Sequence, residues 1–296
     1  MTDLTGKVAV ITGAASGIGA SGVEVFVEAG AQVVAADIQD DKGAALVARF
    51  GEDKVAYQHC DVTDMTSLEA LMQSAVDTFG GLDILWNNAG SGGTSSSVEE
   101  LDLDGYSFTM DLLLKSVFAG THFAVPHMKA RGGGSVINTS SISAVCAGYA
   151  PITYSVAKKA VAHFSKLAAA ELSKHQIRVN AILPGFIATS IFGASLGLPR
   201  EQADQMAEMV AQAGGAMQPV GRTGKGEDIA QMAAFLSSDT AGFVTGGEFV
   251  VDGGITVGPP HSWNEQLGGP ILDALGITPE QAEQMAEAMR SGQGVG

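Results

Sequence analysis

Three polar side chains at fixed spacing can carry out acid–base chemistry. Tyr154 and Lys158 stand four residues apart, and Ser141 precedes the tyrosine by thirteen residues. Residues four apart share one face of a helix, so a phenol and an ammonium would lie side by side. The cation is expected to lower the pKa of the phenol below its usual value near ~10, which would make it a proton acceptor for an alcohol. Many helices contain this pair by chance, and the surrounding sequence decides its meaning.

The elements that must position these residues follow a simple alternation. Up to about residue 255, short apolar runs alternate with longer amphipathic segments, which is typical of a parallel sheet covered by helices on both faces. The expected strands are Val8–Thr12, Gln32–Ala36, Val55–Gln58, Ile84–Asn87, Ser135–Thr139, Arg178–Leu183 and Glu248–Val251. The expected helices are Ile18–Ala29, Asp41–Phe50, Thr66–Phe79, Gly105–Lys129, Ile152–Lys174 and Gly226–Ser237. No linker divides the pattern, so the sequence predicts one doubly wound α/β domain, a Rossmann fold of about seven strands over residues 1–257.

A glycine-rich turn follows the first expected strand and precedes the first expected helix. It contains Gly13, Ser16, Gly17, Ile18 and Gly19. Glycines allow a sharp turn and bring backbone N–H groups close to a pyrophosphate, and the helix directs its positive end at the same anion. In this place along an α/β chain the turn predicts a dinucleotide site rather than a plain strand-to-helix connection.

Asp37, after the second expected strand, indicates which dinucleotide would bind. A carboxylate there can accept hydrogen bonds from the adenosine ribose hydroxyls and would repel a 2′-phosphate. Its neighbours Ala36, Ile38 and Gln39 offer no cation for that phosphate. The sequence therefore predicts NAD rather than NADP.

Taken together, these motifs resemble those of the single-domain short-chain dehydrogenase/reductase family over roughly residues 5–255. The resemblance implies that the cofactor also contacts further residues: Ile38, Asp61, Val62, Asn88, Ala89, Gly90, Pro184, Gly185, Ile187 and Thr189. It implies that a hydride passes between the nicotinamide and a carbinol carbon while Tyr154 moves the hydroxyl proton. Ser141 would orient the substrate oxygen, and Lys158 would hold the nicotinamide ribose and lower the pKa of the tyrosine.

One position departs from the family pattern. Leu113 stands where the family usually carries an asparagine that anchors a water leading from the lysine to bulk solvent. Leucine can neither donate nor accept a hydrogen bond. The proton relay is therefore expected to use another route, or to run more slowly.

The composition restricts partners and location. A formal charge of −16 disfavours nucleic acid and equally an acidic carrier protein. The two cysteines, Cys60 and Cys146, form no disulfide framework or metal site, and no metal is expected. No leader segment precedes the first strand, and no apolar stretch approaches the ~18 residues of a membrane helix. These features predict a cytoplasmic protein without a membrane partner, and we expect a homodimer or homotetramer.

Two segments interrupt the alternation. Residues 191–219, with Met206, Met209 and Met217, are either a mobile apolar substrate lid or an ordinary helix that packs its methionines on the body. The tail, residues 258–296, is expected to pack on the body or on a neighbouring subunit, or to border a pocket.

Three functions fit these motifs. The leading one is an NAD(H)-dependent oxidoreductase that interconverts a secondary alcohol and a ketone, on an apolar, cyclic or steroid-like substrate. A carrier-linked 3-ketoacyl reductase would share the motifs, although Asp37 and the acidic charge disfavour it. A non-enzymatic NAD-binding protein on the same fold is the third, which the intact Ser141, Tyr154 and Lys158 oppose.

Overall fold

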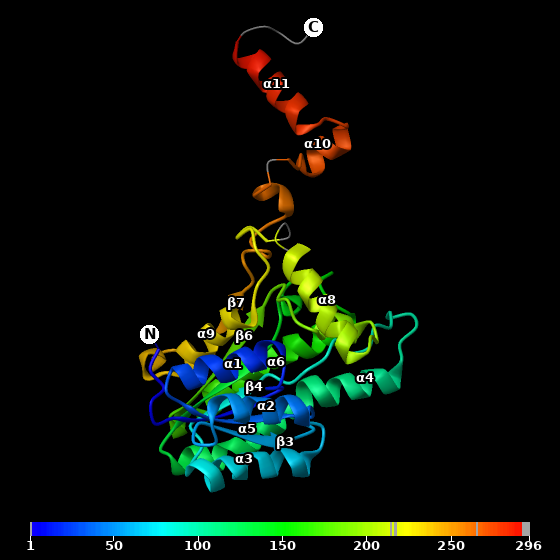
Figure 1. Cartoon of the computed structure of the whole chain (residues 1–296). Helices are drawn as coiled ribbons and strands as arrows, with labels where there is room; N and C mark the ends of the chain where they lie inside the picture. Colours follow the sequence, from blue (N-terminus) through cyan, green and yellow to red (C-terminus); the bar gives the residue numbers. More distant parts are fainter. Residues whose placement is uncertain (1, 214, 216–217, 265, 292–296) are drawn as a thin grey trace.

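A computed structural model describes residues 2–213, 215, 218–264 and 266–291 of the chain. The predicted lid residue Met217 and the last residues of the tail, 292–296, lie outside the described residues. Figure 1 shows a layered α/β body from which the C-terminal segment projects.

A seven-stranded sheet forms the centre of the body, and every described strand pair in it is parallel. Its order is β3-β2-β1-β4-β5-β6-β7. The strands are β1 (Val8–Thr12), β2 (Gln32–Asp37), β3 (Val55–His59), β4 (Ile84–Asn87), β5 (Gly134–Thr139), β6 (Ile177–Pro184) and β7 (Glu248–Val251). The chain order reverses between β1 and β4, and ligands of such sheets bind outside the carboxyl ends of the strands at this reversal.

Helices cover both faces of the sheet (Figure 1). They are α1 (Gly17–Glu28), α2 (Asp40–Phe50), α3 (Met65–Phe79), α4 (Leu103–Met110), α5 (Ser116–Ala130), α6 (Ile152–Leu172), α7 (Ile191–Ser195), α8 (Arg200–Ala213) and α9 (Gly226–Ser237). Helices α1, α2 and α9 pack on one face, and α3, α5 and α6 on the other. In β1, Ala9 and Ile11 face the first group while Val8 and Val10 face the second, because side chains alternate along a strand. The predicted fold class is confirmed.

One predicted helix is wrong in detail. The segment expected as a single helix, Gly105–Lys129, forms α4, a π-helical turn over Asp111–Lys115, and α5. A π-turn holds an extra residue and changes the phase of the helix. Three consecutive leucines, Leu112, Leu113 and Leu114, fit either phase, so the apolar pattern could not reveal the change.

The tail forms two further helices, α10 (Gly269–Leu275) and α11 (Pro279–Arg290). Figure 1 shows them beyond the body. Thr278 caps α11, and Gln281 completes the capping box. None of the residues of α11 is buried.

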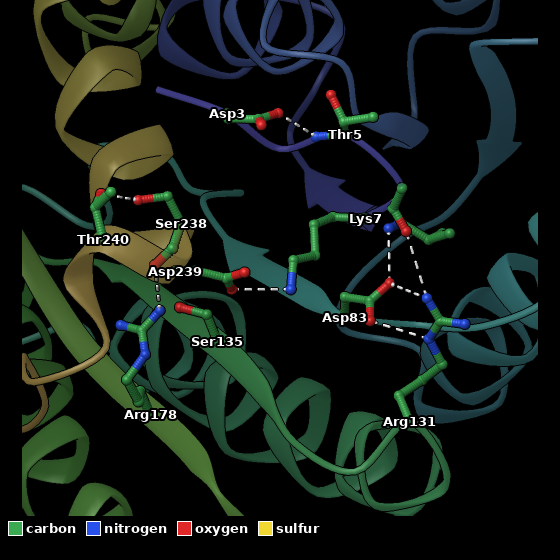
Figure 2. A network of polar contacts seen from close by, with 12 residues as sticks. Asp3, Thr5, Lys7, Asp83, Arg131, Ser135, Arg178, Ser238, Asp239 and Thr240 are labelled. Atoms are coloured by element: carbon green, nitrogen blue, oxygen red, sulfur yellow. Dashed lines mark hydrogen bonds and ion pairs between the residues drawn. The ribbon is translucent and has the colours of Figure 1, made fainter. Parts of the chain in front are cut away.

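At the amino end of the sheet, a network of ion pairs ties the strands to the neighbouring loops (Figure 2). Arg131 donates to both carboxylate oxygens of Asp83, at 2.9 and 3.0 Å. The same carboxylate accepts the backbone N–H of Val8 at 2.9 Å. Lys7 pairs with Asp239 at 3.0 Å. These contacts join the starts of β1 and β4 to the ends of α5 and α9.

No helix among the described ranges is long and apolar enough to cross a membrane.

Candidate active site

The turn between β1 and α1 presents backbone amides at the carboxyl end of the sheet. Gly13 (φ +65°) and Gly17 (φ +52°) adopt left-handed conformations that favour glycine. A Cβ on Gly19 would stand 2.0 Å from the carbonyl oxygen of Gly13, so no side chain fits at that position. Helix α1 begins after Ser16 without a side-chain cap. Its first N–H groups are therefore available to an anion such as a pyrophosphate, and the predicted turn fits this group.

Asp37, at the end of β2, is held against this turn. Its Oδ2 accepts the N–H of Ala15 at 2.9 Å, and its Oδ1 accepts the backbone and side-chain N–H groups of Gln39, both at 3.1 Å. The Gln39 amide also lies 3.4 Å from the hydroxyl of Ser16. Within the described part of the chain, no ion pair includes Asp37. A carboxylate without a cation at this position fits the diol of a ribose better than a phosphate.

The ends of β1 and β4 are joined by a hydroxyl that sequence reasoning did not assign a role. The Oγ1 of Thr12 accepts the backbone N–H groups of Asn88 and Ala89, each at 3.0 Å. The Asn88 side chain donates to the carbonyl of Thr12 at 3.1 Å. A Cβ on Gly13 would stand 2.8 Å from the Cα of Ala89. This packing brings the predicted segment Asn88-Ala89-Gly90 directly against the glycine turn.

Lys158 lies on α6 with its ammonium turned into the protein. Only 4% of the residue is exposed, and Nζ donates to the carbonyl of Thr139 at 2.7 Å. The hydroxyl of Ser140 in turn donates to the backbone carbonyl of Lys158 at 2.7 Å. Burial lowers the pKa of Lys158 to about 8, since desolvation disfavours the charged form. A polar partner that replaces the lost water would raise this pKa again.

Tyr154 corrects one prediction. Its partner Lys158 lies on the same helix face, with Nζ 5.6 Å from the centre of the phenol ring, as the spacing predicts. However, burial raises the pKa of Tyr154 to about 12, and the nearby Ser141 hydroxyl opposes this shift only in part. Desolvation of the phenolate is the largest cause of the shift, and Lys158 is not among the causes that oppose it. The predicted lowering of the pKa of Tyr154 by the neighbouring cation is thus not what the chain's own groups produce, because burial raises this pKa.

Ser141 follows β5 and begins a short 3-10 helix, Ile142–Ala144. Its Oγ accepts the N–H of Ser143 at 3.1 Å, which fixes the side chain. A serine hydroxyl that accepts one bond can still donate its own proton. Ser141, Tyr154 and Lys158 therefore meet at the carboxyl end of β5. Cys146, partly exposed, lies shortly after this helix.

Leu113, in the middle of the π-turn, is fully buried and reaches this group. Its Cδ2 lies 3.0 Å from the point where a Cβ of Gly90 would stand, and the Nζ of Lys158 lies 3.8 Å from the same point. Leu113 and the Lys158 ammonium thus border the same space beside Gly90, and the side of the ammonium that faces the π-turn, called its inner side below, has an apolar neighbour.

The segment after β6 returns to the glycine turn. Gly185 donates its N–H to the carbonyl of Val251 at 3.0 Å, directly after Pro184. Ile187 is buried and forms a bridge with Gly224. The side chain of Thr189 comes so close to Gly17 that a Cβ there would stand 3.1 Å from its methyl carbon. The predicted nicotinamide-binding segment and the predicted pyrophosphate turn are therefore adjacent.

The predicted adenine side is more open. Ile38 is 60% exposed beside Asp37. Asp61 uses its Oδ1 to accept the N–H and the hydroxyl of Thr63, at 2.9 and 2.7 Å, while Val62 is buried. The N–H of Cys60 donates to the carbonyl of Asp37 at 3.0 Å. The ends of β2 and β3 thus form one edge on which an adenine ring could lie.

The predicted lid consists of α7 and α8. Ala203 of α8 is buried against Gly193 of α7. Met206 is half-buried, whereas Met209 is 62% exposed. Gln218, which sequence reasoning missed, donates its side-chain amide to the carbonyl of Phe186 at 3.0 Å and joins the end of this segment to the loop after β6.

Comparison with known proteins adds independent evidence. A family model described as "Enoyl-(Acyl carrier protein) reductase" matches residues 13–256. The chain is 41% identical over 255 residues to momilactone A synthase of Oryza sativa subsp. japonica, across 86% of this chain and 91% of that protein. It is 41% identical over 254 residues to 3beta-hydroxysteroid dehydrogenase 2 of Eggerthella lenta, across 85% of this chain and 95% of that protein.

Two further matches agree with these. The chain is 37% identical over 252 residues to cyclohexanol dehydrogenase of Acinetobacter sp. (strain SE19), across 84% of this chain and 95% of that protein. Among solved structures, a short-chain type dehydrogenase/reductase from Mycobacterium marinum matches with a TM-score of 0.77 at 30% identity, across 87% of this chain and 98% of that chain. The tail after residue 256 lies outside the family match.

Fold and sequence matches together define the class, an oxidoreductase built on a Rossmann-like sheet. The chain belongs to the short-chain dehydrogenase/reductase family. It is thus an oxidoreductase of CH–OH groups that uses a nicotinamide cofactor, NAD or NADP, and members of this family act on small molecules and are typically oligomeric.

Proposed function

We propose that this chain interconverts a secondary alcohol and a ketone with NAD(H), and that its substrate is an apolar cyclic compound such as a cyclohexanol or a steroid. The observation that carries the proposal is the meeting of Ser141, Tyr154 and Lys158 at the carboxyl end of β5. The adjacent glycine turn and the Thr189 segment offer a cofactor the neighbouring space.

The preference for NAD rests on Asp37. Its carboxylate is fixed by Ala15 and Gln39, and none of the described ion pairs supplies it with a cation. A 2′-phosphate would meet this negative charge at close range, whereas ribose hydroxyls could donate to it. Discrimination of about tenfold or more, worth ~1.4 kcal/mol, is expected.

The substrate class rests on relatives. Two of them are named as dehydrogenases of a 3beta-hydroxysteroid and of cyclohexanol. The exposed Met209 and the half-buried Met206 of the α8 segment could supply an adaptable apolar wall, which supports an apolar ring as the substrate.

In the proposed oxidation, the phenolate oxygen of Tyr154 takes the hydroxyl proton of the alcohol while Ser141 donates a hydrogen bond to the same oxygen. The C–H bond of the carbinol carbon breaks with its electron pair, and a carbonyl group forms. Bound NAD would supply the hydride acceptor and a positively charged ring. Lys158 would bind the nicotinamide ribose hydroxyls, which replace the water that its ammonium has lost. The charge so maintained would lower the pKa of Tyr154 from the value that burial imposes.

The test is a panel of cyclic, aryl, steroid and linear alcohols with NAD or NADP, followed by the absorbance of the reduced cofactor between pH 6 and 10. We expect turnover of cyclic alcohols with NAD and a rate that rises with pH as Tyr154 loses its proton. Absence of turnover with every alcohol at alkaline pH, or a flat pH profile, would contradict the proposal.

A second candidate is a carrier-linked reductase, because the matching family model is described by an acyl-carrier-protein reaction. The net charge of −16 would repel an acidic carrier, and Asp37 opposes NADPH. Adding a carrier-bound and a coenzyme-A-bound 3-ketoacyl substrate to the panel separates the two candidates. Faster reduction of these thioesters with NADPH than of any cyclic ketone with NADH would favour the carrier-linked reductase.

A further inference from the structure

Lys158 is a buried cation whose surroundings provide little polar contact. Its Nζ donates to the Thr139 carbonyl, and desolvation is the one cause of its lowered pKa. No charged group is among the causes of the shift, and the titratable group that the ammonium faces is Tyr154, whose ring centre lies 5.6 Å from Nζ. Asp111 and Lys115 of the π-turn are about half exposed and pair with each other at 3.3 Å. The loss of water around the ammonium therefore sets the direction of this shift.

The π-turn is packed against α6, the helix that carries Lys158. Leu113, at its centre, is fully buried. Its Cδ2 and the Nζ of Lys158 lie 3.0 and 3.8 Å from the point where a Cβ of Gly90 would stand. A π-turn replaces the regular bonds of an α-helix by bonds between residues five apart. Here the buried Ser116 hydroxyl donates to the carbonyl of Leu112, so this carbonyl has a partner within the protein.

We propose that Leu113 is a positioning residue that keeps water away from the inner side of the Lys158 ammonium, so that the charge of this lysine depends on groups that approach from the cofactor side. The proposal deepens the function proposed above and rests on it. A proton taken up by Tyr154 would then leave through the ribose and substrate side of the site and not through the π-turn.

The direct test measures the titration of Lys158 in the whole protein, independently of turnover. The chain is labelled with 13Cε-lysine, and the Lys158 resonance is assigned by its loss in Lys158→Met. We expect Leu113→Asn, which adds an amide and room for water, to raise the pKa of Lys158 by at least about one unit. Leu113→Met, which keeps an apolar side chain of similar volume, should leave the titration unchanged.

The pH profile of alcohol oxidation supplies the second readout. A lysine that stays charged to higher pH stabilises the phenolate, so Leu113→Asn should reach half-maximal oxidation at a lower pH than the parent, while Leu113→Met should not. If Leu113 only fills space, Leu113→Asn would lose stability and leave the Lys158 titration where it was, which would overturn the proposal.

Two outcomes separate this inference from the proposed function. If the parent oxidises no alcohol, the proposed function fails, yet the resonance titration still decides the role of Leu113. If Leu113→Asn does not fold, as judged by circular dichroism, the smaller Leu113→Thr replaces it. An unchanged Lys158 titration in a folded Leu113→Thr variant would likewise overturn the proposal.

Discussion

The cations at the two ends of the central sheet differ in burial and in ion pairing. At the amino end, Arg131 is bonded to both oxygens of Asp83, and Lys7 pairs with Asp239 (Figure 2). At the carboxyl end, Lys158 is more deeply buried than either, and no described ion pair includes it.

This difference distinguishes cations that stabilise the fold from a cation that is available to a ligand. A cation paired in partly exposed surroundings costs little and fixes the register of loops and strand ends. A buried cation without an acid costs stability, because desolvation is not repaid. Such a residue is expected where a ligand completes its surroundings, and the sheet reversal between β1 and β4 is the place where this family of folds binds ligands.

The largest effect should come from the acid–base group at the carboxyl end. Tyr154→Phe removes the proton acceptor and little else, so we expect turnover to fall by about 10²–10⁴-fold. Binding of NADH, measured by its fluorescence, should be retained. Turnover that survives in this variant would show that Tyr154 is not the proton acceptor and would leave Tyr154 and Lys158 a structural role.

Lys158→Met should lower turnover and raise the free energy of unfolding. The pKa of Lys158 is lowered to about 8 in the folded protein. Its charged form therefore destabilises the fold fully at any pH below this value. The penalty disappears as the pH rises to the pKa of a lysine in the unfolded chain. Removal of the buried charge should raise the free energy of unfolding by about 3 kcal/mol. The Thr139 carbonyl loses its donor, which costs ~1 kcal/mol. A net increase of about 2 kcal/mol is therefore expected at pH 7. Urea unfolding at pH 7 and pH 10 measures it, and the gain should shrink at pH 10.

The matched control is Lys7→Met at the amino end. It removes a paired, partly exposed cation, so we expect a small loss of stability and no gain. Equal gains in both variants would show that the two ends do not differ as described.

Asp37→Ser tests the preference of the site for a ribose 2′-hydroxyl over a 2′-phosphate. The variant removes the repulsion of a 2′-phosphate and a contact to the ribose. We therefore expect the ratio of kcat/KM for NAD over NADP to fall by about tenfold or more, ~1.4 kcal/mol. An unchanged ratio would show that Asp37 acts only as the clamp of Ala15 and Gln39.

The smallest effect is expected at the amino end itself. Arg131→Ala leaves Asp83 with the Val8 amide as a partner, so we expect a loss of about 0.5–1 kcal/mol in the free energy of unfolding, less at high salt, with kcat unchanged. Unfolding at low and high salt, with turnover as the control, measures both. A marked loss of turnover would mean that this network also supports the site.

Much of the fold could be predicted because its signals are local. Every predicted strand appears in the structure, and the predicted start of α6 at Ile152 is that of the structure. The division of the helix around Leu113 could not be predicted, since three adjacent leucines fit both helical phases. The roles of Thr12 and Gln218 were also missed, because a single threonine or glutamine carries no signal until its partner strand is known.

The sequence by itself determined the family, the order of the elements and the residue types at the candidate site, because glycine turns, apolar periodicity and the spacing of Tyr154 and Lys158 are properties of neighbouring residues. Only the tertiary structure decided the electrostatics of that site. Burial raises the pKa of Tyr154 to about 12 and lowers that of Lys158 to about 8. The desolvation of each group depends on the packing of segments that are distant in the sequence, and spacing along the chain does not reveal it.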